Sequence, residues 1–300
     1  MREALESVSR QTWLAKNPDS LEILLVIDGE CDGYESQIPS ELKPILKILK
    51  IPHCGVSGAR NHAIEKAASD KYIAFLDADD VWIPQKLEQQ VTWMDTHPDC
   101  GMVYTNSFWI DKSGRVLSRT QSDQYGYLPD GDIKKPMLER DYIITSSVLL
   151  RKNVFAKAGM FRTDLEVCED WEFKIRVAKS FRVHSILEPL IYYRLHAEGT
   201  HYKCARMLEC GYMVFEEHLQ TELAGFSNGQ MQSFKANIPL NLAGSLLYID
   251  RPKDARKYLA ESYRLNPRNK RLYLMFGLTL LPTWARDILL YIRDKFKFLP

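Results

Sequence analysis

Two nearly continuous apolar runs, each ending on aspartate, limit most strongly what this chain can fold into. The first, LEILLVID, spans Leu21 to Asp28, and the second, YIAFLDADD, spans Tyr72 to Asp80. Runs of this kind are typical of strands buried on both faces of a parallel sheet. Short helical patterns separate them, so the sequence predicts an α/β fold with a mixed, mostly parallel sheet flanked by helices.

The predicted elements alternate over roughly the first two thirds of the chain. Helices are expected over residues 2–13, from about 59, over 83–98 and over 169–180, and strands over 21–28, 45–52, 71–80, 100–111, 142–152 and 184–196. Pro84 is placed in the first turn of its helix, and Pro189 is expected to break the last strand. After about residue 203 helical periodicity dominates, with a helix pair joined at Arg251–Pro252. We therefore expect two domains, residues 1–202 and a C-terminal helical appendage over residues 203–300.

Composition excludes several classes of protein. The 300 residues carry a formal net charge of +1, so no overall positive field favours nucleic acid as a partner. The six cysteines form no CxxC pair, which indicates free thiols in a reducing cytoplasm rather than a zinc or disulfide framework. No apolar run reaches the roughly 20 residues of a membrane-spanning helix.

The acidic cluster after the second apolar run is the first candidate site. Residues two apart on a strand point the same way, so Asp77 and Asp79 project together. Paired carboxylates are oxygen ligands suited to Mg²⁺ or Mn²⁺, which complete their coordination with phosphate and water. Helix capping would account for one aspartate but not for three. We expect Asp80 to serve the helix that follows.

Glu169 and Asp170 form a second acidic pair, at the start of the 169–180 helix. Acids are common at the positive end of a helix without any catalytic role. The pair is therefore a candidate for catalysis only in combination with the aspartates of residues 77–79.

Taken together, these blocks resemble the family 2 glycosyltransferases, which are inverting sugar-nucleotide enzymes of the GT-A fold. The resemblance covers about residues 3–197 and is carried by ALESVSRQTW, LEILLVIDG, GVSGARNHAIEKA, YIAFLDADDVWIPQKLEQQV, CEDWEFKIRVAK and EPLIYYRLH. It implies a sugar transferred from a nucleotide-diphosphate donor, with a UDP-sugar expected, to a glycan or lipid-linked hydroxyl in cell-surface polysaccharide synthesis.

The resemblance also implies a role for each matching residue. Asp28 and Arg60 would bind the nucleotide, and Asp77 would hold ribose or metal. Asp79 would bind the Mg²⁺ or Mn²⁺ that bridges the diphosphate, and His196 matches a position that touches metal or diphosphate in some enzymes. Asp170 would be the general base, with Glu169 beside it. An ordinary surface role for His196 stays open.

The chain departs from the family pattern in two places. Members usually begin with a strand reading roughly VSVIIPTYN, which lies centrally in the sheet and lines the nucleotide site, whereas this sequence opens inside the following helix. We expect a shortened chain or a start codon placed downstream of the true one. Members also usually carry two aspartates where this chain has Ile27 and Asp28.

Two alternative functions follow from these features. A catalytically impaired, glycosyltransferase-like binding or scaffold protein fits the missing strand. A nucleotidyltransferase fits the acidic metal site but not the second acidic pair or the YYRLH block.

The last 15 residues, RDILLYIRDKFKFLP, are amphipathic and basic, so they are consistent with a peripheral membrane contact or with a helix that faces a soluble partner.

Overall fold

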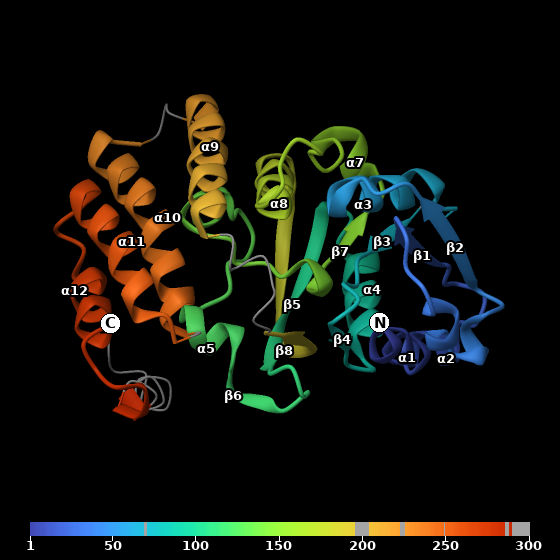
Figure 1. Cartoon of the computed structure of the whole chain (residues 1–300). Helices are drawn as coiled ribbons and strands as arrows, with labels where there is room; N and C mark the ends of the chain where they lie inside the picture. The colour runs from blue at the N-terminus through green and yellow to red at the C-terminus, as the bar shows by residue number, and fades with distance from the viewer. Residues whose placement is uncertain (69–70, 196–203, 223–225, 249, 286–287, 290–300) are drawn as a thin grey trace. The chain divides into compact units, whose positions relative to one another are not determined.

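The computed structural model describes residues 1–68, 71–195, 204–222, 226–248, 250–285 and 288–289. The chain folds as two compact units (Figure 1). One comprises Met1–Lys134 and Tyr142–Leu195, and the other Lys135–Asp141 and His196–Pro300. The domain boundary predicted at residues 202 and 203 falls within residues 196–203, which lie outside the described residues, and it stays a prediction.

The first unit contains all the strands of the described chain. They are β1 (Ile23–Asp28), β2 (Leu46–Ile51), β3 (Tyr72–Ala74), β4 (Val81–Trp82), β5 (Cys100–Ile110), β6 (Val116–Thr120), β7 (Leu149–Arg151) and β8 (Arg182–Arg194). Its helices are α1 (Arg2–Ser9), α2 (Thr12–Lys16), α3 (Gly55–Lys66), α4 (Lys86–Thr96), α5 (Gln121–Tyr125), α7 (Asn153–Ala158) and α8 (Glu169–Ser180), with 3-10 turns η1 (Tyr34–Gln37), η2 (Ser40–Leu42) and η3 (Thr145–Ser147).

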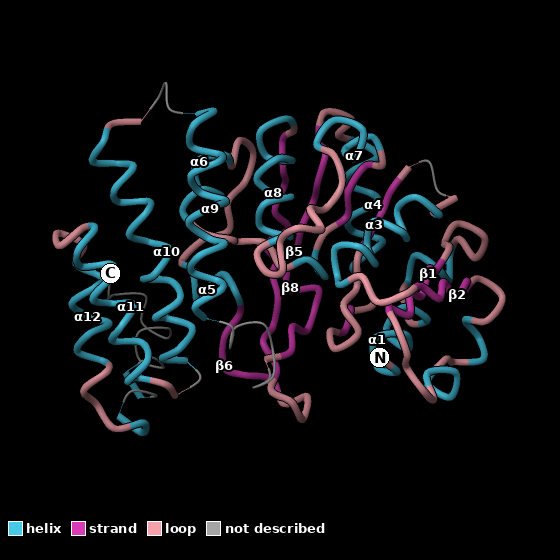
Figure 2. The backbone as a smooth tube through the Cα atoms, turned by 45° about the horizontal axis from the view of Figure 1, so that its top comes forward, coloured by secondary structure: helices cyan, strands magenta, loops and turns pink. Residues whose placement is uncertain are grey.

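The mixed α/β fold is confirmed, although fewer strand pairs are parallel than the apolar runs predict. β1 pairs with β2 in parallel, as a two-stranded sheet. The larger sheet has the order β3-β7-β5-β8-β4, with β6 on β5, and of its pairings only β5–β8 is parallel. The β5–β8 pair, visible side by side in both views (Figures 1 and 2), forms the centre of this sheet.

Pro189 does not break β8, contrary to the expectation. The strand continues because the β5–β8 register shifts on both sides of Asn106, the partner of Pro189. The Asn106 side-chain amide donates to the carbonyl of Leu187 at 3.1 Å. A bulge accommodates a residue that has no N–H to donate, and here a side chain replaces the missing ladder bonds.

Several predicted boundaries were wrong where distant contacts decide them. The strand predicted over 71–80 is limited to β3, which pairs with β7 over three residues. Most of the strand predicted over 142–152 is the turn η3 followed by the short β7, and Pro84 lies before α4 rather than inside it. Helix α3 begins at Gly55, four residues before the expected Ala59.

The second unit is helical, as predicted. Its helices are α6 (Lys134–Glu139), α9 (Cys204–Glu222), α10 (Asn228–Tyr248), α11 (Pro252–Leu265) and α12 (Lys270–Leu278). The predicted junction at Arg251–Pro252 is confirmed, with Pro252 in the first turn of α11. One apolar core, including Leu246, Leu259 and Leu272, joins α10, α11 and α12.

In the part of the chain that is described, no helix combines the length and apolar character needed to cross a bilayer. The predicted amphipathic segment at the C-terminus lies mostly outside the described residues, which lack 286–287 and 290–300. The proposed membrane contact of that segment therefore stays a prediction.

A substitution at Gly101 of β5 can show how closely the end of α8 must pack on the sheet. A Cβ at this position would lie 2.5–2.8 Å from side-chain atoms of Phe181, the residue that follows α8. We expect Gly101→Ala to lower the free energy of unfolding by about 1–3 kcal/mol, because neither backbone can move away easily. Urea denaturation measures this change.

The matched control is Gly277→Ala on α12, where an added Cβ meets no atom within 4 Å. There alanine should leave stability unchanged or raise it, by up to about 1 kcal/mol, because alanine favours helices. Equal stability of Gly101→Ala and the parent would contradict the packing argument.

Candidate active site

A single serine holds the aspartate-rich loop that follows β3. The hydroxyl of Ser146, in η3, accepts from the Asp77 N–H at 3.1 Å and donates to Asp80 Oδ2 at 2.5 Å. The Trp82 indole donates to the Ser146 carbonyl at 2.8 Å. Ser146 therefore fixes both ends of the loop, and Asp77 and Asp79 start from a defined backbone.

Asp80 anchors the loop from inside the protein. Its side chain is buried, and Oδ1 accepts from the Arg194 N–H at 3.0 Å. Burial, with the nearby charges of Asp77 and Asp79, raises the pKa of Asp80 to about 8, although the Ser146 hydrogen bond opposes this shift. The expectation that Asp80 serves the next helix was wrong, because α4 begins only at Lys86, after β4.

Arg194 fastens the same loop from β8. Its Nε donates to the backbone carbonyl of Asp79 at 2.8 Å, and its guanidinium also pairs with Glu3 of α1. Because this contact uses the Asp79 backbone, the loop is held without enclosing the partly exposed Asp79 residue. His196, two residues further on, lies outside the described residues, so its predicted role stays a prediction.

Arg60 joins the two acidic elements. From α3 its guanidinium donates to Asp77 Oδ1 at 2.9 Å and to Glu169 Oε1 at 3.0 Å, and it lies over the ring of Phe161. The side chains of Arg60 and Glu169 are only 11% and 10% exposed, against 39% for Asp77. The predicted nucleotide residue Arg60 thus links the loop after β3 to the first turn of α8.

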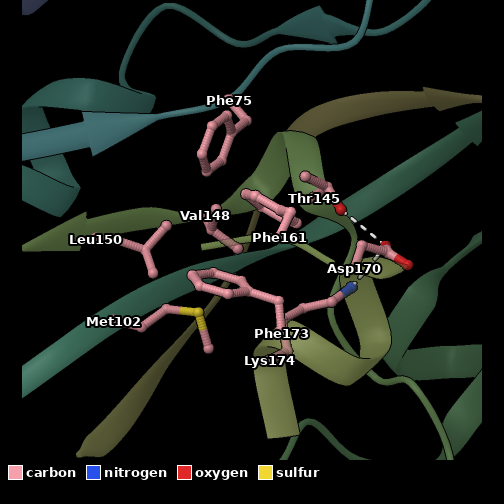
Figure 3. A pocket seen from close by; sticks show the side chains of 9 residues that line it. All are labelled: Phe75, Met102, Thr145, Val148, Leu150, Phe161, Asp170, Phe173 and Lys174. Carbon is pink, nitrogen blue, oxygen red and sulfur yellow. Dashed lines mark hydrogen bonds and ion pairs between the residues drawn. The ribbon is translucent and has the colours of Figure 1, made fainter. Parts of the chain in front are cut away.

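Asp170 lies at the start of α8 and, with Phe75, Phe161 and Phe173, lines a small cavity (Figure 3). Its Oδ2 accepts from Thr145 Oγ1 at 2.8 Å and from Lys174 Nζ at 2.9 Å. Burial alone would raise the pKa of Asp170, but the charges of Lys174 and Arg60 outweigh it and lower the pKa. Asp170 is therefore ionised.

The neighbouring Glu169 has the opposite shift. Burial and the negative charge of Asp170 raise the pKa of Glu169 to about 7, despite the opposing charge of Arg60. The pKa values of the two adjacent carboxyl groups thus shift in opposite directions, because Lys174 pairs directly with Asp170 whereas Asp170 places a negative charge beside Glu169. Lys174 lies four residues after Asp170, a spacing that the sequence could have revealed on a predicted helix.

Asp28 has a different role from the residues around Arg60. Its carboxylate accepts from the N–H groups of Cys54 at 2.7 Å and Gly55 at 3.0 Å, and pairs with His53. Partial burial would raise the pKa of Asp28, but these hydrogen bonds and His53 lower it. Asp28 thus caps α3 from the end of β1, and nucleotide binding by Asp28 stays a prediction.

The donor set at the loop suits a divalent cation only in part. Asp77 and Asp79 supply oxygen ligands of the type that Mg²⁺ and Mn²⁺ prefer. Within the described residues no group of three or more His, Cys, Asp or Glu side chains is arranged to hold a metal. A cation held here would therefore need further ligands, and a diphosphate with water can supply them.

The model of the family described as Glycosyl transferase family 2 matches residues 1–157, more than half of the chain. The chain belongs to glycosyl transferase family 2. Sequence reasoning identified this family correctly, although it missed Thr145, Ser146, Lys174 and Arg194.

Three curated relatives of this family 2 chain are named only as uncharacterized glycosyltransferases. MJ1057 of Methanocaldococcus jannaschii is 26% identical over 200 residues, covering 65% of this chain and 66% of the relative. RP339 of Rickettsia prowazekii is 32% identical over 213 residues (70% and 64%), and YibD of Escherichia coli K12 is 27% identical over 233 residues (69% and 66%). The match spans slightly less than two thirds of each relative.

A solved structure supports the GT-A fold of this family 2 chain. It is the mannosyltransferase PcManGT from Pyrobaculum calidifontis, in complex with GDP-Man and Mn²⁺. The TM-score is 0.59 with 17% sequence identity, over 99% of this chain and 83% of that one. At 17% identity, the similarity of the two structures is evidence for a shared fold alone.

Ser146→Ala tests whether the serine positions the aspartates of this family 2 site. The change leaves Asp80 and the Asp77 N–H without their shared partner, and we expect a loss of stability of about 1–3 kcal/mol. Metal-dependent binding of a nucleoside diphosphate should also weaken, as isothermal titration can measure.

Ser147→Ala is the matched control. Its hydroxyl belongs to the same turn but donates to the carbonyl of Ile144, away from the aspartates. Ser147→Ala should retain the parent's nucleotide affinity. Equal weakening by both variants would show that the turn as a whole matters and not the Ser146 bridge.

Proposed function

We propose that the chain is an inverting glycosyltransferase that moves a sugar from a nucleotide-diphosphate donor to a hydroxyl of a glycan or lipid-linked acceptor. The observation that carries this proposal is the Arg60 bridge between Asp77 and Glu169. The bridge ties the candidate metal and diphosphate end of the site to the candidate base, Asp170. A single displacement needs these two functions on opposite sides of the reacting carbon, and therefore on different elements.

Asp77 and Asp79 would hold the cation, together with the donor diphosphate. When bound, Mg²⁺ or Mn²⁺ supplies Lewis-acid neutralisation of the departing diphosphate. Because Asp77 already accepts from Arg60, Asp79 is the better candidate for the direct ligand. Arg60 then keeps Asp77 oriented and adds positive charge next to the phosphates.

Asp170 would accept the proton of the acceptor hydroxyl. Its side chain is 28% exposed, so an acceptor can reach it. Thr145 and Lys174 fix the orientation of the carboxylate and keep it ionised. A lowered pKa makes Asp170 a weaker base, but it guarantees the unprotonated form at neutral pH.

The nucleobase of the sugar donor is a separate prediction. A UDP-sugar stays our prediction for this chain, whereas the solved PcManGT is in complex with GDP-Man. A role in cell-surface polysaccharide synthesis likewise stays a prediction.

Asp170→Asn should abolish sugar transfer while leaving donor affinity almost unchanged. Asparagine has nearly the same shape but cannot take a proton, so the loss should reach at least about a hundredfold. Turnover assays and nucleotide titration measure the two quantities separately. Asp164→Asn, the same change on an exposed carboxylate paired with Arg162, is the control and should remain fully active. Full activity of Asp170→Asn would remove it as the base.

Asp79→Asn should remove the metal dependence of nucleotide binding. For the parent we expect UDP or GDP to raise the melting temperature only with Mn²⁺, because ligands that bind the folded state stabilise it by mass action. In Asp79→Asn the same nucleotide should give the smaller shift seen without Mn²⁺. A metal-dependent shift of the parent's size in the variant would contradict the assignment.

A glycosyltransferase-like binding protein without turnover is the second candidate. A cavity of about 600 Å³, lined by residues of β1 and β3 and by Asp77, leaves one side of the site open, which favours this candidate. Metal-dependent nucleotide binding by the parent, without transfer to any of a panel of acceptors, would support it.

A further inference from the structure

Two consecutive residues of η3 hold the two acidic halves of the site. The Thr145 hydroxyl donates to Asp170 Oδ2 at 2.8 Å (Figure 3). The Ser146 hydroxyl donates to Asp80 Oδ2 at 2.5 Å and accepts from the Asp77 N–H at 3.1 Å. Because the two hydroxyls belong to adjacent residues, a shift of η3 would displace Asp170 and the loop after β3 together.

The backbone of the turn does little to fix its position. The Ser147 N–H donates to the Ile144 carbonyl at 2.9 Å, and the Val148 N–H donates to the Thr145 carbonyl at 3.3 Å. Such bonds close a 3-10 turn, but in a turn of three residues they are few and their geometry is poor. The position of η3 therefore depends on groups outside the turn.

Two side chains of α4 bind the carbonyls at the end of the turn. Gln90 Nε2 donates to the Ser147 carbonyl at 2.8 Å, and Lys86 Nζ donates to the Val148 carbonyl at 3.4 Å. Lys86 Nζ also donates to Gln90 Oε1 at 2.7 Å, so the two side chains, four residues apart on α4, form a pair. Gln90 Nε2 donates in addition to the Val103 carbonyl of β5 at 3.1 Å, which fixes the pair to the sheet.

Trp82 gives the same pair a second connection to the turn. Lys86 Nζ lies 4.2 Å from the centre of the Trp82 ring. The face of an aromatic ring carries partial negative charge and attracts the N–H groups of the lysine. The Trp82 indole in turn donates to the Ser146 carbonyl at 2.8 Å. Directly or through Trp82, the pair thus reaches the carbonyls of all three residues 146–148.

Lysine would be a poor choice at position 86 if the site needed only packing. The Lys86 side chain is 0% exposed, and within the described chain no Asp or Glu pairs with it. Burial alone lowers the pKa of Lys86 well below its usual range, so the charged form is disfavoured here. Methionine would fill a similar volume without this desolvation cost. The amine therefore indicates a role beyond packing, and the groups that it contacts are those that hold η3.

We propose that Lys86 and Gln90 are positioning residues of the candidate active site. They hold η3 in the place from which Ser146 fixes the loop after β3 and Thr145 fixes Asp170. Both are fully buried, so they act through the turn and not by touching a ligand. This inference rests on the proposed function, because a single displacement needs the two acidic elements at a fixed separation.

Hydrogen exchange measured by NMR tests the positioning directly. The Asp77 N–H reports on its acceptor Ser146, and the Trp171 N–H, which donates to Asp170 Oδ1 at 2.8 Å, reports on the other half of the site. In Lys86→Met we expect both amides to exchange at least about tenfold faster than in the parent. The melting temperature should stay within about 4 °C of the parent's, because relief of the buried lysine offsets the lost hydrogen bonds. Neither readout depends on nucleotide binding or transfer.

Gln90→Leu is the second variant, and Gln89→Leu is its matched control. Gln90→Leu removes the donor to the Ser147 carbonyl and should accelerate exchange of the same two amides. Gln89, one residue earlier on α4, donates instead to Glu188 at 2.6 Å on the exposed side, so Gln89→Leu should leave both amides unchanged. Unchanged exchange at either amide in both Lys86→Met and Gln90→Leu, or equal acceleration in Gln89→Leu, would overturn the proposal.

Nucleotide affinity shows whether Lys86 acts through Ser146. In isothermal titration with UDP or GDP and Mn²⁺, we expect Lys86→Met to bind at least about fivefold more weakly than the parent. In a chain that already carries Ser146→Ala, Lys86→Met should change the affinity by less than about twofold, because both changes disturb one contact. Equal factors in the two backgrounds would show that Lys86 acts elsewhere and would overturn the proposal.

The same titration separates this inference from the proposed function. Absence of Mn²⁺-dependent nucleotide binding by the parent would contradict the proposed function. The exchange rates of the Asp77 and Trp171 amides would still decide whether Lys86 and Gln90 position the two acidic elements.

Discussion

The buried guanidinium of Arg60 is the interaction on which the candidate site depends. It lies between Asp77, in the loop after β3, and Glu169, at the start of α8 and 109 residues from Arg60 in the sequence. A buried cation is tolerated only with well-placed carboxylate partners, and removing one partner leaves an uncompensated charge. Arg60 therefore forces α3, the loop after β3 and α8 into one relative position, and that position brings Asp170 near the aspartate loop.

Local patterns predicted the charged residues of the site but not what holds them. Asp77, Asp79, Glu169 and Asp170 were identifiable because each pair stands at the predicted boundary of a strand or helix. Ser146 was not, since its hydrogen bonds join residues 66 and 69 positions away, and a serine in a hydroxyl-rich stretch carries no signal of that contact.

The wrong boundaries have the same origin. Helix α3 begins early because Asp28, 26 and 27 residues upstream, caps its first N–H groups, whereas the sequence within the helix indicates only the later start. β8 passes through Pro189 because Asn106 of another strand compensates for it. Propensity and periodicity describe near neighbours, so a cap or a bulge supplied by a distant residue lies outside what they can predict.

Charge balance explains how so many acids share one site before any ligand is bound. Burial raises the pKa of Asp80 to about 8, and burial together with the charge of Asp170 raises the pKa of Glu169 to about 7. Arg60 and Lys174 then compensate Asp77 and Asp170, which are their direct partners. Asp79 thereby adds negative charge at the partly exposed surface of the loop, where the Arg194 contact is to its backbone. The protein thus compensates its buried carboxyl groups internally, and Asp79 lies partly exposed at the surface of the loop.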